Sequence, residues 1–317
     1  MSIMSPEPRT GWASKKGRHQ KRKMLITGGS GFLGRYLVRK LLNKYADLGI
    51  SIIARSGEGI IRLLSVCPGA QFKTIVGDIR NEEVLQFALK DVDTVVHLAA
   101  MKYINLCELS PSEAITINVH ATASLLKLFK GDTFISMSTD KAVESTSCYG
   151  ATKLIVEKLT LAEASMNTGK RFMVVRSGNI FGSAGSVLEN WHRQVKRNNE
   201  IVVSNPEMTR FFIDVIDLAE YIITILNNGE NGKIYIPPQK VIQIGDLAQA
   251  FVELRGDGAT KMKVVGQFQG EKTHERLFMS GEDVVTDMKH NNSDEGKKLS
   301  LEEIKEWLQR NAADKDF

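Results

Sequence analysis

The sequence of 317 residues has few cysteines, few aromatic residues and no long apolar segment. Cys67, Cys107 and Cys148 are odd in number and widely spaced, which argues against a disulfide framework and favours the reducing cytoplasm. No apolar run is long enough to cross a bilayer and the N-terminus lacks a signal-like apolar core, so we expect no membrane span. The histidines have no close ligand partners in the sequence, so we expect no metal site.

Positive charge is concentrated at the N-terminus. The whole chain has a net charge of +5, whereas residues 1–23 hold seven Lys or Arg and one Glu, a local charge of +6. This composition predicts a disordered basic tail over residues 1–22; a tail that binds RNA or anionic lipid is the alternative. The remaining chain is not basic, so we expect no nucleic acid to bind the folded body.

Short apolar strands alternate with amphipathic helices from residue 23 onward. Short links between such elements are typical of an α/β fold with a doubly wound parallel sheet of the Rossmann type. The predicted strands are Met24–Thr27, Ile50–Ala54, Phe72–Val76, Thr94–Leu98, Thr133–Ser136 and Arg171–Arg176. The predicted helices are Tyr36–Tyr45, Glu82–Leu89, Pro111–Phe129 and Tyr149–Ala164.

The pattern changes after Ser177, which divides the chain into two parts. We expect a Rossmann cofactor-binding domain over residues 23–180 and, over residues 181–317, mainly a smaller C-terminal substrate-binding lobe. Residues 211–236 contain a helix and a strand that we expect to return to the Rossmann domain. Ser300 and Glu303 have capping-box spacing and predict the beginning of a terminal helix.

Three glycines, Gly28, Gly31 and Gly34, follow the first strand and open the first helix. In this context they allow a tight turn that brings the backbone close to a dinucleotide pyrophosphate, while the alternative is a purely structural turn. Arg55 and Ser56 end the second strand, where an acidic residue would select NAD. Arg55 can bind a 2′-phosphate through two hydrogen bonds, so NADP is the predicted cofactor.

Tyr149 and Lys153 lie four residues apart, on one face of a predicted helix that follows the fifth strand. A nearby ammonium lowers the pKa of a phenol, which makes tyrosine a usable base for a sugar hydroxyl. Tyr36 and Lys40 have the same spacing, but they lie on the helix behind the glycine turn, away from the expected ligand edge.

The tetrad Ser138-Thr139-Asp140-Lys141 stands directly after the fifth strand. Thr139 could hydrogen-bond the hydroxyl that Tyr149 deprotonates, and Asp140 and Lys141 add an acid and a base at the same edge. The alternative is a helix cap followed by a solvated lysine. If a desolvated site lowers the pKa of Lys141, its amine can act as a base near neutral pH.

Several motifs occur in the order seen in UDP-N-acetylglucosamine 4,6-dehydratases: TGGSGFLG, GDIRN, HLAAMKYI, STDKAV, YGATK, GNIFGSAGSV, MTRFF and GEKTHE. Over roughly residues 23–285 the chain most closely resembles the short polysaccharide-biosynthesis group of extended short-chain dehydrogenases, which also inverts C5. The resemblance implies that Tyr149 and Lys153 start oxidation at C4. It also implies that Asp140 and Lys141 handle the C5 proton and the loss of the C6 hydroxyl as water, with Lys141 taking the C5 proton.

The resemblance also assigns binding residues. The implied cofactor contacts are Gly28, Ser30, Gly31, Phe32, Leu33, Gly34, Arg55, Ser56, Asp78, Ile79, Ala99, Tyr149 and Lys153. The implied substrate contacts are Lys102, Asn179, Thr209, Arg210 and Glu271. The expected partner is therefore a UDP-sugar, and we expect a homo-oligomer.

The chain departs from the family pattern at three places. Ser177 replaces the tyrosine of RYGN, Ala184 replaces the arginine of GSRGS, and Phe268-Gln269 replaces the Arg-Pro of RPGEK. Two arginines that would face an anionic nucleotide are thus absent, so the nucleotide affinity or the base and 2-substituent of the substrate can differ. The leading hypothesis is an inverting 4,6-dehydratase; a nucleotide-sugar 4-epimerase and a non-catalytic NADP-binding regulator are the alternatives.

Overall fold

The computed structural model describes residues 21–268 and 270–313, and its main feature is an eight-stranded parallel sheet. The sheet confirms the predicted Rossmann-type α/β fold. Its spatial order is β13-β10-β6-β5-β4-β1-β2-β3. The strands are β1 (Lys23–Thr27), β2 (Gly49–Ala54), β3 (Lys73–Val76), β4 (Thr94–His97), β5 (Thr133–Thr139), β6 (Arg171–Ser177), β10 (Ile234–Ile236) and β13 (Val284–Thr286).

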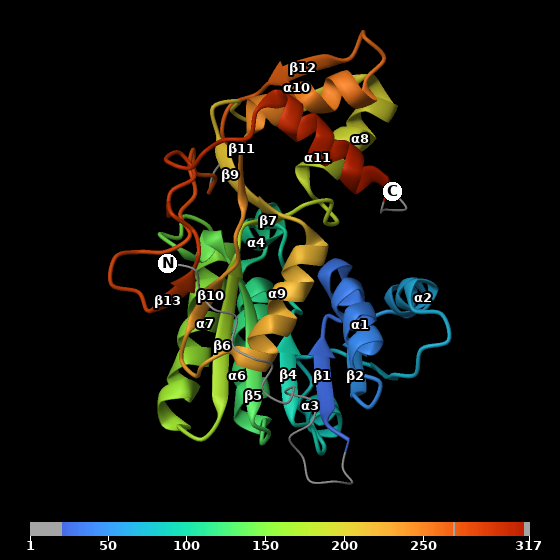
Figure 1. Cartoon of the computed structure of the whole chain (residues 1–317), viewed down its shortest axis with the longest axis vertical. Helices are drawn as coiled ribbons and strands as arrows, with labels where there is room; N and C mark the ends of the chain where they lie inside the picture. Colours follow the sequence, from blue (N-terminus) through green and yellow to red (C-terminus); the bar gives the residue numbers. More distant parts are fainter. Residues whose placement is uncertain (1–20, 269, 314–317) are drawn as a thin grey trace.

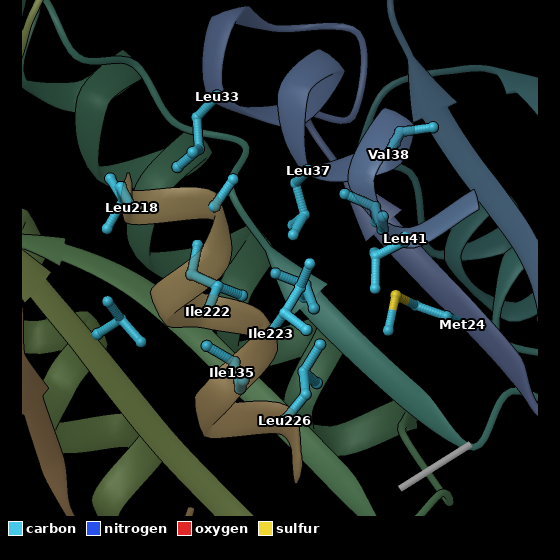
Figure 2. Close-up of a cluster of buried hydrophobic side chains, with 14 of the residues drawn as sticks. Met24, Leu33, Leu37, Val38, Leu41, Ile135, Leu218, Ile222, Ile223 and Leu226 are labelled. Carbon is cyan, nitrogen blue, oxygen red and sulfur yellow. The ribbon is translucent and has the colours of Figure 1, made fainter. Parts of the chain in front are cut away.

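Helices cover both faces of the sheet (Figure 1). One face carries α1 (Phe32–Lys44), α2 (Gly57–Val66) and α9 (Val215–Asn228), and the other carries α3 (Glu82–Ala88), α6 (Ala121–Leu128) and α7 (Cys148–Met166). Figure 2 shows Leu37 and Leu41 of α1 facing Ile223 and Leu226 of α9 above the sheet. Burial of each such side chain contributes about 1.5–3 kcal/mol, so this contact fixes the position of α9 on the Rossmann domain.

A smaller lobe lies beyond the carboxyl ends of the sheet strands (Figure 1). In its core, Phe181 packs against Trp307 and Trp191 packs against Phe251. The lobe contains α8 (Val187–Asn198), β8 (Glu200–Val203), α10 (Ile244–Arg255), β12 (Lys261–Val264) and α11 (Leu301–Ala313). A three-stranded sheet of β7 (Asn179–Ile180), β9 (Thr209–Ile213) and β11 (Lys240–Gln243) joins it to the Rossmann domain.

The predicted helix Pro111–Phe129 is interrupted. It consists of α5 (Pro111–Ile115), a π-helical turn (Thr116–His120) and α6. The turn positions Asn118, whose side chain bonds the backbone of Met101 and the hydroxyl of Thr152. Tertiary hydrogen bonds, which sequence periodicity does not show, account for the interruption.

Other elements differ from the sequence-based expectation. The predicted return of residues 211–236 begins later, because residues 211–213 belong to β9 and the return starts with α9 at Val215. Helices α2 and α4 (Ile104–Leu109) and strand β13 were not predicted. The capping box of α11 forms as expected, since Ser300 and Glu303 exchange hydrogen bonds.

A buried guanidinium attaches the C-terminal segment to the Rossmann domain. Arg176, at the end of β6, is fully buried and donates to both carboxylate oxygens of Glu157 on α7. It also donates to both oxygens of Glu282 and to the carbonyl of Leu277. Because removing one partner would leave buried charge uncompensated, this cluster fixes residues 277–282 against α7.

The predicted tail of residues 1–22 lies largely outside the described residues, but its last residue is folded. Arg22 is 6% exposed, and its two terminal nitrogens lie 3.3 and 2.9 Å from the carboxylate oxygens of Asp132. Its carbonyl accepts a hydrogen bond from Gly49. The expectation that the tail extends to residue 22 is therefore wrong, because Arg22 belongs to the folded domain.

We expect Arg22→Ala to lower the free energy of unfolding by about 1–2 kcal/mol, because a two-nitrogen contact to a half-exposed carboxylate is lost. Lys21→Ala is the matched control, since Lys21 and its partner Asp47 are both largely exposed. Chemical denaturation of both variants measures the difference. Equal stability of the two variants would show that Arg22 is not part of the folded domain.

Candidate active site

A cleft of about 890 Å³ lies between the carboxyl edge of the sheet and the smaller lobe. The two parts of the chain both line it, with Gly28 and Lys153 from the Rossmann side and Trp191 and Arg210 from the other. Ligands bind at this edge in open α/β sheets because the loops after the strands converge there.

The glycine turn forms one end of the cleft. Gly28 has a φ of +71°, and a Cβ at that residue would lie 2.8 Å from the amide nitrogen of Ala99. A Cβ at Gly34 would overlap the carbonyl of Gly28. The first residues of α1 line the cleft, and the N-cap residue of this helix, Gly31, has no side chain to cap it. The turn thus leaves room at the helix N-terminus for an anion such as a pyrophosphate.

The structure brings together every residue that was predicted to bind the cofactor, except Ser56. Ser56 instead precedes α2 as its N-cap residue and does not line the cleft. Arg55 is exposed and lines the cleft close to Asp78. Hydrogen bonds from Arg80 lower the pKa of Asp78, with smaller contributions from other groups that include Arg55.

Tyr149 and Lys153 lie at the beginning of α7, where Ser147 caps the helix through the amide of Gly150. A Cβ at Gly150 would overlap the carbonyl of Lys141, so the helix begins in direct contact with the segment after β5. This close approach explains why the Tyr149 pair and the Lys141 segment line the same cleft.

The electrostatics of the pair differ from the sequence-based expectation. Burial raises the pKa of Tyr149, as does Asp140, and a hydrogen bond with Thr139 opposes the shift only in part. Burial lowers the pKa of Lys153 to about 8, against the opposing effect of Glu157. The expectation that the lysine lowers the phenol pKa is therefore wrong for the protein alone, because desolvation of the phenol dominates.

Thr139, Asp140 and Lys141 form a hydrogen-bonded group at the end of β5. Asp140 is fully buried, and its Oδ1 accepts from the Thr139 hydroxyl at 2.9 Å and from Lys141 Nζ at 3.0 Å. Lys141 Nζ also lies 3.3 Å from the side-chain oxygen of Asn179. Thr139 and Lys141 line the cleft whereas Asp140 does not, so Asp140 lies behind Lys141.

The sequence reasoning missed Glu275, which lies opposite this group. Its side chain is 3% exposed and lines the cleft, and its Oε1 is 3.7 Å from Lys141 Nζ. Lys272 Nζ lies 3.7 Å from its Oε2, and Arg210 Nε lies 4.0 Å from Oε1. Glu275 is the last residue of the GEKTHE motif, and this motif was the available signal.

The predicted depression of the Lys141 pKa is wrong. Burial acts to lower it, but Asp140 and Glu275 together outweigh burial and raise the pKa. Lys141 is therefore an ammonium at neutral pH, and it can act as a base only after it passes a proton to a neighbour.

The substrate residues predicted from the sequence are only partly brought together. Lys102, Asn179, Arg210 and Glu271 line the cleft. Arg210 is held by the carbonyls of residues 209, 272 and 273. Thr209 is fully buried outside the cleft and bonds His274 and Ser293, so the structure does not support a substrate contact from Thr209.

The three departures from the family pattern lie at the cleft. Ser177, Ala184 and Phe268 all line it. The carbonyl of Ala184 accepts a hydrogen bond from Lys102 Nζ at 2.8 Å, and burial lowers the pKa of this lysine. Phe268 is 55% exposed and offers an aromatic ring at the same site. These substitutions give this part of the cleft a less cationic lining.

Residues 21–268 and 270–313 lack the features of a membrane span and of a clustered metal site. None of the helices in this part of the chain combines the length and apolarity needed to cross a membrane. The same residues include no cluster of His, Cys, Asp and Glu side chains that could hold a metal ion.

Comparison with known proteins identifies the family. The model of the polysaccharide biosynthesis protein family matches residues 24–295. The chain belongs to this family. It is similar to the inverting UDP-N-acetylglucosamine 4,6-dehydratase of Campylobacter jejuni (serotype O:2), with 33% identity over 272 residues, 84% of this chain and 80% of the relative.

Two other similar proteins widen the comparison. The UDP-glucose 4-epimerase of Rickettsia bellii (strain OSU 85-389) is 30% identical over 325 aligned positions, which cover 90% of this chain and 94% of the relative. The crystal structure of Pen from Bacillus thuringiensis has a TM-score of 0.84 and 26% identity, over 91% of this chain and 98% of that one. The relatives thus include both a dehydratase and an epimerase.

We expect Tyr149→Phe to keep the fold and the binding of a dinucleotide but to reduce turnover at least about 100-fold, the scale of general-base loss. Tyr36→Phe is the matched control, because Tyr36 has the same spacing to a lysine but packs against Phe32 on α1. Steady-state rates and calorimetry of both variants make the comparison. Near-normal turnover of Tyr149→Phe would exclude this phenol as the base.

Proposed function

We propose that this protein is an NADP-dependent 4,6-dehydratase that acts on UDP-N-acetylglucosamine and inverts C5. The observation that carries the proposal is the Asp140–Lys141 pair, which stands beside Tyr149 at the edge of one cleft. A 4-epimerase needs a base for the 4-hydroxyl but no acid and base for C5 and C6. The identity to the Campylobacter enzyme supports the same assignment.

The glycine turn and Arg55 are the residues that would hold the dinucleotide. The turn leaves space where a Cβ would collide with backbone, and Arg55 offers a guanidinium suited to a 2′-phosphate. A bound nicotinamide would supply reversible hydride transfer: a redox-neutral dehydration needs a hydride acceptor for C4 and then a hydride donor for C6.

The side chains of the cleft would move the protons. The ammonium of Lys153 stabilises the phenolate form of Tyr149, and this phenolate takes the proton of the 4-hydroxyl and becomes a neutral phenol. A ketone at C4 makes the C5 proton acidic. Lys141 passes one proton to Asp140, accepts the C5 proton on its free amine and delivers it to the departing C6 hydroxyl, which leaves as water. The proton held by Asp140 then returns to Lys141, so the pair ends as it began.

Inversion at C5 requires that a new proton, supplied by solvent, arrive from the face opposite to the one that lost it. Tyr149 releases the proton of the 4-hydroxyl to solvent, so the protons balance over the cycle. The proposed product is the L-arabino 4-keto-6-deoxy sugar of UDP. We further propose that the enzyme works in the cytoplasm as a homo-oligomer.

A 4-epimerase is the second candidate, and the similarity to the Rickettsia enzyme favours it. Incubation with UDP-N-acetylglucosamine in deuterated water, followed by NMR, distinguishes the two reactions. We expect a 4-keto-6-deoxy product with deuterium at C5 and the L-arabino configuration. Conversion to the 4-epimer with no loss of the C6 hydroxyl would contradict the dehydratase assignment, and a D-xylo product would contradict inversion alone.

We expect Arg55→Ala to weaken the binding of NADP much more than that of NAD, because NADP alone carries the 2′-phosphate. Loss of a charge-assisted two-hydrogen-bond contact corresponds to roughly a tenfold or larger increase in Kd. Calorimetry with both dinucleotides measures the change. Arg62→Ala is the control, since Arg62 pairs with Glu58 on the exposed side of α2. Equal losses for the two cofactors, or preferential binding of NAD by the unchanged protein, would contradict the assignment.

A further inference from the structure

We propose that Glu275 is a positioning residue for the dehydration, which fixes the charge and the location of the Lys141 ammonium. The inference rests on the proposed function, in which Lys141 faces the sugar. Asp140 reaches Lys141 from the neighbouring position in the sequence, whereas Glu275 comes from a distant segment of the chain. Lys141 Nζ therefore has one carboxylate at 3.0 Å and a second at 3.7 Å.

The backbone of Glu275 is held in place independently of its side chain. Its amide donates to the Ser293 hydroxyl at 2.9 Å, and its carbonyl accepts from the Ser293 amide at 2.9 Å. Ser293 itself bonds Thr209 at the start of β9. These contacts hold the backbone of Glu275 without any contribution from Lys141, while its side chain lines the cleft.

The distances around the carboxylate indicate an electrostatic role. Glu275 Oε2 is buried and makes no hydrogen bond within the described part of the chain. Three cations surround the carboxylate at 3.7 to 4.0 Å: Lys141, Lys272 and Arg210. A carboxylate whose only role is to link two chain segments would accept short hydrogen bonds. A buried carboxylate at these distances instead stabilises the charged form of its neighbours.

Of the three cations, Lys141 is the one whose charge Glu275 can affect in the proposed reaction. Lys272 Nζ donates to the carbonyl of Val143 at 2.5 Å, and Arg210 is held by three backbone carbonyls. Among the described residues, Lys141 Nζ is hydrogen-bonded only to the side chains of Asp140 and Asn179. Arg210 and burial both act to lower the Lys141 pKa, and Asp140 and Glu275 act to raise it. Removal of Glu275 therefore tips this balance toward the free amine.

The test measures the charge of Lys141 without turnover. Labelling with acetic anhydride over a range of pH, read by mass spectrometry, follows the fraction of free amine at each lysine. We expect Glu275→Gln to increase the labelling rate of Lys141 about tenfold at neutral pH, the effect of losing one opposite charge at this distance. Glu275→Asp keeps the charge and should stay near the unchanged protein. Glu295→Gln, an exposed acid of the same segment, is the matched control.

Steady-state kinetics then distinguish a Glu275 that positions Lys141 from a Glu275 that only stabilises the fold. In Glu275→Gln, the limb of the pH–rate profile that Lys141 governs should move to lower pH, kcat should fall and KM should change little. A folded Glu275→Gln variant with an unchanged Lys141 titration and an unmoved limb would overturn the proposal. If this variant does not fold, the test falls to the unchanged protein. Its Lys141 must titrate above the ordinary pKa of a lysine, about 10.4, and a midpoint at or below that pKa overturns the proposal.

The labelling result also separates the two hypotheses. If no UDP-sugar is dehydrated but Lys141 responds to Glu275→Gln as expected, the proposed function fails and the electrostatic role of Glu275 stands. If dehydration is observed and Lys141 does not respond, the role of Glu275 fails and the function stands.

Discussion

The ammonium of Lys141 lies between the carboxylates of Asp140 and Glu275, and the chemistry of the cleft depends on this arrangement. Asp140 directly follows β5 of the Rossmann sheet, whereas Glu275 belongs to the segment that crosses back from the smaller lobe. A charge in a desolvated site is costly unless it is paired, so contacts from both parts of the chain favour the charged form of the lysine. Folding of the C-terminal segment and protonation of Lys141 are thereby coupled.

The buried Arg176 cluster holds helix α7 against the segment that follows Glu275. Glu157, one turn after Lys153 on α7, accepts two hydrogen bonds from Arg176, and Glu282 on the crossing segment accepts two more. The same guanidinium thus fixes the helix that carries Tyr149 and the segment that follows Glu275. Glu157 acts to raise the Lys153 pKa, and its pairing with Arg176 places this acid in a fixed position beneath the lysine.

Local sequence patterns predicted much of the fold and some, but not all, of the residues and charges of the site. The glycine turn, the capping box at Ser300 and the alternating strands are encoded within a few residues, so they could be found in the sequence. Strand β13 has three residues and depends on pairing with β10, and Glu275 acquires its neighbours only when distant segments meet. The pKa of Lys141 was predicted in the wrong direction because one of the two carboxylates that raise it was not known to be near.

The central claim is that the cleft has two separable parts: Tyr149 and Lys153 for oxidation, and Lys141 with its carboxylates for elimination. The most direct test is a single-turnover measurement on Lys141→Met with bound NADP and UDP-N-acetylglucosamine, which follows the absorbance of reduced nicotinamide. The account predicts that reduced cofactor forms and persists while no dehydrated product appears. Normal release of dehydrated product by this variant, or the absence of reduced cofactor in a folded variant that binds both ligands, would contradict it.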